Sequence, residues 1–283
     1  MKAWIIGILL VLFVAAGWYF YSASQKEDAP APPPTVAVIE EAPAPEVIED
    51  ESVEEFVQQP EPPEALEPVV EEKPLPPLQD SDPLAAESLG SLVGVAMAER
   101  YFASEDVISR MVTTVDALGS SQVPGAIQAV QGPEGDFEVT VDDQPDASIV
   151  NEEGDPIPQF LSDPANERRY LVYVEMLEAV DTAQLVELYQ RQDPLFQEAW
   201  RQLGYADGDF NQRLLAVIDE LLATPEVEGP LRLKKPEAYY LFSDDELESL
   251  SAGQKILLRM GSENAARVKA KLSEIRQALL NAQ

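Results

Sequence analysis

One charge-free stretch, residues 3–21, constrains this chain more than any other part of its sequence. It reads AWIIGILLVLFVAAGWYFY. At about 1.5 Å per residue, a helix of this length spans roughly 28 Å, which is enough to cross the hydrocarbon core of a bilayer. Trp4 lies near one end, and Trp18 and Tyr21 lie at the other, where aromatic rings prefer lipid headgroups. The stretch therefore predicts a transmembrane anchor at residues 1–21.

A cleaved signal peptide is the alternative interpretation of the same stretch. Lys2 supplies a short positive region, and residues 14–16 would serve as a small-residue cleavage site. A retained anchor is favoured because the apolar run is longer than a usual signal sequence and continues into an aromatic cluster.

The positive charges that flank the anchor indicate its orientation. Lys2 lies on one side of the stretch and Lys26 on the other, so the bias is small and favours a cytoplasmic N-terminus. We expect a single-pass protein of the inner (cytoplasmic) membrane with the bulk of the chain in the periplasm.

Residues 22–79 form a linker rich in proline and acidic residues. Thirteen of the 24 prolines lie between Pro30 and Pro77, interleaved with Glu and Asp. Proline favours an extended backbone and like charges repel each other, so the sequence predicts a disordered, stretched tether. It serves either as a spacer or, through apolar patches such as residues 36–39 and 53–57, as a docking strip; the spacer is favoured.

Residues 80–283 show the apolar periodicity and the capping signals of helices. Residues 181–184 and 251–254 match the capping-box pattern, and the last helix repeats apolar residues at intervals of three and four. We expect an all-α helical bundle domain. Residues 119–162 interrupt it as an irregular insertion, in which Phe137, Val139 and Val141 alternate as in a small β-hairpin. Residues 225–242 are a second connector.

The composition excludes several classes of function. The formal charge is −33, from 52 acidic and 19 basic residues, and such a chain repels nucleic acid. The absence of His and Cys removes zinc sites built from them, thiol nucleophiles and Ser-His-Asp triads. An apparent calcium loop at Asp207 fails because Gln212 stands where the loop requires glycine. No cofactor, metal site or catalytic residue is predicted.

Arginines in an acidic domain are candidates for binding an acidic ligand or partner, because a guanidinium binds a carboxylate at two points. Several lie beside aromatic or amide residues. The alternative is that they form internal ion pairs with acids such as Glu175 or Asp219. The candidates of this group are Asn166, Arg168, Arg169, Tyr170, Tyr173, Asn211 and Arg213.

The last segment offers a second set of candidates, a basic face. Lys255 and Arg259 are four residues apart, as are Arg267 and Lys271, so each pair shares one side of a helix. This face would bind the acidic linker, an acidic partner or lipid headgroups. The alternative is that these charges only balance the acidic surface.

Long motifs in the helical region resemble a known family. They are ERRYLVYVEMLEAVD (167–181), LFQEAWRQLGY (195–205), FNQRLLAVIDELLATPEVEGP (210–230) and LSAGQKILLRMGSENAARVKAKL (250–272). They resemble the bacterial domain-of-unknown-function family 3014, over about residues 74–280, with residues 120–160 matching least. The resemblance implies a single membrane anchor, a Pro-rich linker and a shared helical domain, without an assigned activity.

These features favour a membrane-tethered, non-enzymatic module of the cell envelope that binds another protein or an envelope component. The alternative is a carboxylate-dependent hydrolase or lyase that acts on cell-wall glycan, which requires two acids converging on a cleft. A third possibility is a structural spacer or assembly factor. The sequence does not indicate the oligomeric state.

Overall fold

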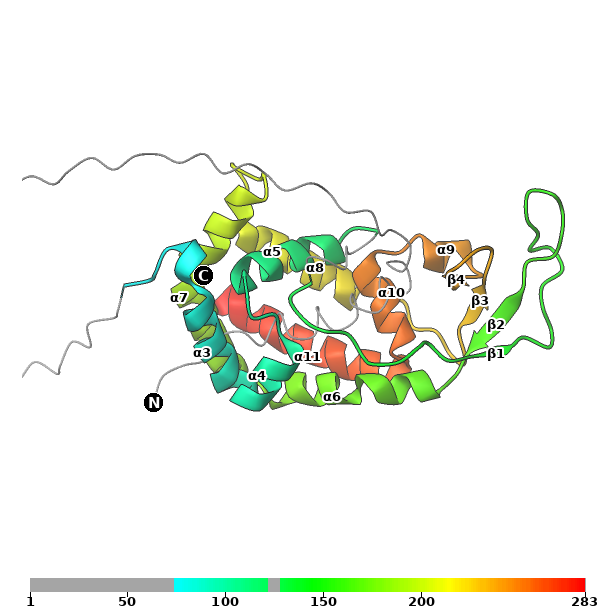
Figure 1. Ribbon diagram of the computed structural model, residues 1–283, viewed down its shortest axis with the longest axis horizontal. Coiled ribbons are helices and arrows are strands. Elements are labelled where there is room, and N and C mark those ends of the chain that lie inside the picture. The colour runs from blue at the N-terminus through cyan, green and yellow to red at the C-terminus, as the bar shows by residue number, and fades with distance from the viewer. Residues whose placement is uncertain (1–73, 122–127, 283) are drawn as a thin grey trace, which may run out of the picture. The chain divides into compact units, whose positions relative to one another are not determined.

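The computed structural model describes residues 74–121 and 128–282 of the chain. From Leu75 onward these residues belong to one compact unit. The unit is mostly helical, as predicted, and carries a small antiparallel sheet (Figure 1). The predicted anchor and residues 22–73 of the predicted linker lie outside the described residues. Within the described ranges, no helix combines the length and the apolar character that crossing a membrane requires.

The helices of the described unit follow one another with short connections, apart from two longer segments that contain the strands. After the 3-10 turn η1 (Leu78–Asp80), they are α3 (Asp82–Val93), α4 (Val95–Tyr101), α5 (Val107–Leu118), α6 (Ala165–Ala179), α7 (Thr182–Gln202), α8 (Phe210–Leu222), α9 (Asp245–Glu248), α10 (Ala252–Arg259) and α11 (Ser262–Asn281).

Local capping signals set several helix starts where the sequence predicts them. The Asp181 side chain accepts a hydrogen bond from the Gln184 N–H at the start of α7. Ser251 and Gln254 form a reciprocal capping box at the start of α10. These bonds satisfy backbone donors that have no partner inside the first turn.

Pro194 does not divide α7 into two helices, although its missing N–H predicts a kink or a restart. The helix runs without a break from Thr182 to Gln202. The proline leaves the Gln190 carbonyl without a helical donor, but Pro194 and Gln190 are both exposed, so water can reach that carbonyl.

The helices pack around α11 and α5. Helix α11 contacts α6, α7, α8 and α10, and α5 contacts α3, α7, α8 and α10. One side of α11 is buried at intervals of three and four residues, through Val268, Leu272, Ile275 and Leu279. This spacing places one stripe toward the core, as the apolar period predicts.

The sheet corrects the all-α prediction. Strands β1 (Val139–Val141), β2 (Gln159–Ser162), β3 (Arg232–Lys234) and β4 (Leu241–Phe242) pair antiparallel in that order. β1 and β2 form the hairpin predicted within residues 119–162. β3 and β4 come from the segment predicted to be a plain connector, and β3 pairs with β2 about seventy residues away in sequence. Such short strands carry little local signal, and only long-range pairing establishes them.

Helix α10 lies between the helices and the sheet, and all of its residues are buried. Ile256 and Leu257 belong to the main helical cluster, whereas Leu258 packs under the sheet with Leu233 and Phe242. Helix α10 therefore joins two separate hydrophobic clusters.

Candidate functional site

A pocket of about 490 Å³ lies where the sheet meets the starts of α6 and α11. Thr140 of β1 and Leu161 of β2 line it, together with Val227 and Leu231 of the connector after α8. The volume falls within the range of roughly 300–1,000 Å³ that is typical of small-ligand sites. It is the candidate functional site of this unit.

The walls of the pocket are largely apolar. Leu161, Leu231 and Leu257 come from three different elements, and α11 adds the small side chain of Ala265. A few polar groups converge among them, which is the usual composition of a binding pocket. The uncharged or basic ones are Thr140, Ser162, Asn166, Arg259, Ser262 and Lys269.

Asn166 lies in the first turn of α6 and holds the adjacent chain by hydrogen bonds. It is buried, its Oδ1 accepts the Glu138 N–H at 2.9 Å, and its Nδ2 donates to the carbonyls of Glu138 and Asp163 at 2.7 and 2.8 Å. These bonds attach the chain before β1 to the start of α6 and satisfy the buried amide. Asn166 therefore positions one wall of the pocket.

Arg169 and Tyr173 extend this attachment along α6. The Arg169 guanidinium donates to the carbonyls of Pro133, Glu134 and Gly135, the last at 2.6 Å. The Tyr173 hydroxyl donates to the Gln131 carbonyl at 3.1 Å. The two side chains hold residues 131–135 against the helix.

Tyr170 belongs to the same side of α6 but lies deeper. Its side chain is fully buried, and burial raises the pKa of its phenol, with a smaller opposing effect of Arg259 and Arg169. The phenol therefore stays neutral throughout the physiological range. It packs in the core and does not line the pocket.

Arg259 and Lys255 do not form a basic surface, because both lie inside the unit. Lys255 is 5% exposed, and its Nζ donates to Oε1 of Glu248 at 3.1 Å. Arg259 is 7% exposed, donates to the Tyr240 carbonyl at 3.1 Å, and lies 4.9 Å from the centre of the Phe242 ring. Arg259 also lines the pocket, so it brings a positive charge to a shielded place.

The start of α11 faces the same pocket. Gly261 precedes the helix with a φ of 87°, and no side chain caps the helix at this position. A Cβ at residue 261 would lie 2.5 Å from the Glu167 side chain, so this close approach requires glycine. Ser262 begins the helix and lines the pocket, where the N-terminal dipole favours negative charge.

Lys269 adds a second cation two helical turns after Ser262. Its ammonium donates one hydrogen bond to the Thr224 carbonyl at the end of α8. An ammonium has three donors, and Lys269 lines the pocket. Two cations on α10 and α11 thus approach the pocket from the helical side.

Three acidic residues also line the pocket. Glu167 and Glu226 are exposed, and the half-buried Asp163 accepts the Ala165 N–H at 2.8 Å as a turn of α6 begins. A carboxyl group that acts as a general acid near neutral pH is normally held in a desolvated place. Among the described residues, no group of three or more acidic side chains is arranged to hold a metal ion.

The remaining candidates of the sequence lie away from the pocket. Arg168 is exposed on α6. Asn211 donates to Asp193 at 2.8 Å, and the Arg213 Nε donates to Asp116 at 2.7 Å. Both contacts join neighbouring helices, which fits the alternative of internal polar pairs.

Arg267 and Lys271 form ion pairs on the surface of α11. The Arg267 Nε donates to Oε1 of Glu178 at 2.9 Å, and the Lys271 Nζ donates to Glu274 at 3.0 Å. The structure therefore separates the predicted basic face into two cations buried on α10 and two ion-paired cations on α11. Of all the predicted site residues, Asn166 and Arg259 line the pocket.

Sequence reasoning missed the other polar contributors, among them Ser262 and Lys269, and the connector after α8. One local signal for this part of the site was present in the sequence. Gly261 lies between two segments with helical periodicity and thereby predicts a turn followed by the start of a helix. The Pro- and Gly-rich residues 225–230 indicated a connector, but not its position against α11.

Comparison with known families and proteins gives one match. The model of a family described as "Protein of unknown function (DUF3014)" matches residues 107–276, which is more than half of the chain. This range contains every residue that lines the pocket. No curated protein and no solved structure matches the chain.

Proposed function

This chain belongs to the DUF3014 family, and from that premise we propose that its folded unit is a non-enzymatic binding module that holds part of a partner in the pocket. The observation that carries the proposal is the 490 Å³ pocket, which has apolar walls and lies wholly within the matched range. Pockets of this size and lining bind ligands by shape, with a few polar groups that fix orientation.

The polar groups of the pocket favour a ligand that carries a negative charge. Arg259 and Lys269 are both cationic, and the uncapped start of α11 adds the positive end of a twenty-residue helix. Glu167 and Glu226 also line the pocket and are exposed to water, which screens their repulsion, and the Glu167 side chain lies against Gly261 at the start of α11. We therefore propose an acidic, partly apolar partner segment, from a protein or another envelope component.

The charge-free run at residues 3–21 and the Pro-rich linker support a position for this module. They would hold it at the outer side of the inner membrane, in the periplasm, at a reach on the order of 180 Å. In a variant that lacks residues 22–73, which keeps the folded unit from Leu75 onward intact, the module would lie close to the lipid. We expect this variant to lose crosslinking to its envelope partner, and unchanged crosslinking would contradict the role of the tether.

A filled pocket gives the direct test of binding. Ala266 lines the pocket and is exposed on α11, and Ala270 lies one turn further along the same helix without lining it. Ala266→Trp should weaken binding of an acidic peptide library with free carboxylates by about tenfold or more, whereas Ala270→Trp should change it less than about twofold. Binding is measured by nuclear magnetic resonance titration of the peptides into the full-length protein in detergent.

Two results would contradict the proposal. Equal binding by the two tryptophan variants would show that the pocket is not the binding site. Release of new reducing ends from cell-wall glycan by the purified protein would show an enzymatic activity and thus overturn the non-enzymatic assignment.

A further inference from the structure

The outer edge of β1 presents backbone groups to solvent. In its pairing with β2, the Asp142 N–H donates to the Gln159 carbonyl, and the Asp163 N–H donates to the Glu138 carbonyl. Because backbone groups alternate along a strand, Thr140 also faces β2, whereas Val139 and Val141 direct their N–H and C=O groups away from it. Among the described residues, no hydrogen bond reaches these outward groups.

The opposite edge of the sheet is closed. By the same alternation, the N–H of Phe242 in β4 points away from β3, since Ser243 donates to the Arg232 carbonyl. That outward N–H donates to Oε2 of Glu248 at 2.7 Å, and Lys255 holds the same carboxylate from α10. One edge therefore has a built-in cap, and the other has none among the described residues.

An apolar row crosses one face of the sheet and ends at the open edge. The register aligns Val141 with Phe160, Phe160 with Leu233, and Leu233 with Phe242. Leu233 and Phe242 are fully buried, Phe160 is partly buried, and Val141 is 76% exposed. An apolar side chain on a further strand would cover Val141 and continue the row.

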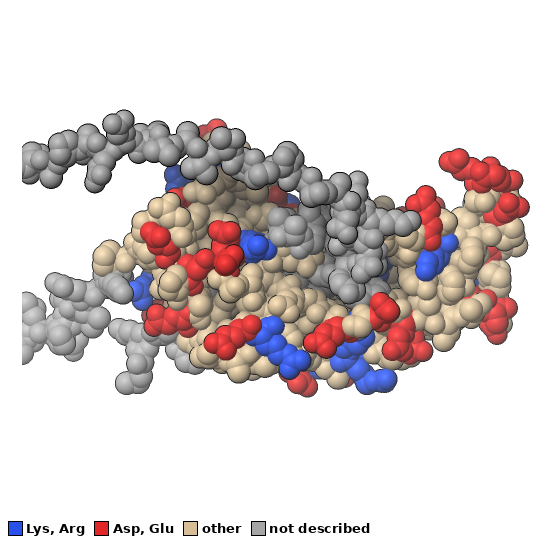
Figure 2. Space-filling view, in the orientation of Figure 1, with Lys and Arg blue, Asp and Glu red and all other residues tan. Residues whose placement is uncertain are grey.

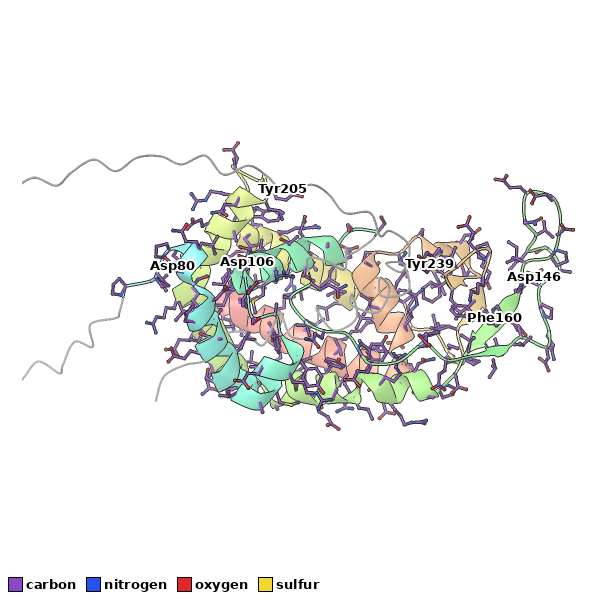
Figure 3. All side chains as sticks on the ribbon, in the orientation of Figure 1. Asp80, Asp106, Asp146, Phe160, Tyr205 and Tyr239 are labelled. Carbon is purple, nitrogen blue, oxygen red and sulfur yellow. The ribbon has the colours of Figure 1, made fainter. Side chains whose placement is uncertain are left out.

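The charges around β1 are acidic. Glu138 and Asp143 flank the strand and are exposed, and the loop from β1 to β2 carries further acids around Asp146 (Figures 2 and 3). A second copy of this chain paired through the same edge would bring identical acids together, which is unfavourable. Charge complementarity selects a basic occupant instead.

We propose that the outer edge of β1 binds an extended basic segment of a partner protein as a fifth, edge strand of the sheet. Backbone hydrogen bonds to Val139 and Val141 supply the pairing, an apolar residue covers Val141, and flanking Lys or Arg residues face Glu138 and Asp143. The site differs from the pocket in its residues, because neither Val139 nor Val141 lines the pocket.

A designed peptide tests the proposal without changing the protein. The probe is acetyl-Lys-Val-Lys-Val-Lys-amide with a fluorescent label, titrated against the full-length chain in detergent and followed by anisotropy. Alternate backbone nitrogens of the bound peptide face β1, and the others face away. Methylation of the set that faces β1 should weaken the affinity about tenfold or more, and methylation of the other set about twofold or less. Equal effects of the two methylated peptides would overturn strand addition.

Variants of Val141 complete the test. Val141→Pro removes an outward backbone N–H but leaves every hydrogen bond between β1 and β2 in place. Val141→Thr keeps this N–H, and threonine is well accommodated in strands. We expect about tenfold weaker binding for the Pro variant and about threefold for the Thr variant.

Two controls separate this site from the pocket and from general charge attraction. The Ala266→Trp variant should bind the basic peptide as the unchanged protein does, even if the pocket proposal fails. The peptide in which Glu replaces every Lys should bind at least about tenfold more weakly. Equal binding of the acidic peptide, or loss of basic-peptide binding in Ala266→Trp, would contradict the proposal.

Discussion

The two hydrophobic clusters of this unit are built differently. The helical cluster buries large apolar side chains from all the long helices, with Phe196, Phe210 and Leu272 fully enclosed. The sheet cluster has only five buried members, among them Leu233 and Phe242. Polar contacts surround the smaller cluster, whereas apolar packing dominates the larger one.

The difference indicates where the unit opens most easily. Burial of apolar surface stabilises the helical part over many contacts, so its loss requires global unfolding. The sheet depends on a few specific bonds, such as Arg232 to Asp142 at 2.9 Å and Lys255 to Glu248 at 3.1 Å. Both proposed binding sites adjoin this less heavily packed region.

The largest expected effect lies in the helical cluster. Phe196 is fully buried on α7, and its ring stacks on Phe210 at 5.8 Å. Phe196→Ala should reduce the free energy of unfolding by about 3–5 kcal/mol, because it removes a large side chain from a packed core. Urea unfolding followed by circular dichroism measures it, with the exposed Gln202→Ala on the same helix as control. A loss below about 1 kcal/mol would contradict the dominant role of this cluster.

The next effect tests the buried ion pair beside the sheet. Lys255→Met leaves the Glu248 carboxylate without its cation, and we expect a loss of about 3 kcal/mol in the free energy of unfolding. The double variant that adds Glu248→Gln should recover part of this loss, because no buried charge then remains. Additive losses in the double-mutant cycle would show that the two side chains are not coupled.

A smaller, local loss of stability is expected at the N-terminus of α6. Asn166→Ala removes two hydrogen bonds to Glu138, before β1, and one to the Asp163 carbonyl, and should cost about 1–3 kcal/mol. Hydrogen exchange should increase first in residues 131–138. Asn211→Ala, which removes a single bond to Asp193, should change stability less. Uniform exchange over the whole unit would contradict a locally held segment.

The smallest effect is expected at the surface of α11, and it depends on pH. The Arg267 hydrogen bond lowers the pKa of the Glu178 carboxyl below its ordinary 4.5. A lowered folded-state pKa contributes stability above the unfolded value, and this contribution disappears as the pH falls through the folded pKa. The stability difference between the unchanged chain and Arg267→Gln should therefore shrink below about pH 4.5. Urea midpoints at pH 7 and below pH 4.5 measure this change, and a difference that grows on acidification would contradict the pairing.

Much of the helical part could be predicted, because its signals are local. The Asp181 cap, the Ser251–Gln254 box and the periodicity of α11 each act within a few residues. The sequence placed Asn166 and Arg259 among the site candidates, but it gave equal weight to residues such as Arg213 that only join helices. Short α4 escaped prediction because its seven residues are too few to show a clear apolar period.

The sequence by itself determined the helical character, the acidic charge and the exclusion of His- and Cys-based chemistry, since these follow from composition and short-range patterns. The tertiary structure decided that all residues of α10 are buried, that residues 225–242 supply two strands, and that one sheet edge is capped by Glu248 while the other has no cap among the described residues. The physical reason is that burial and strand pairing depend on residues distant in sequence, which a local pattern cannot specify.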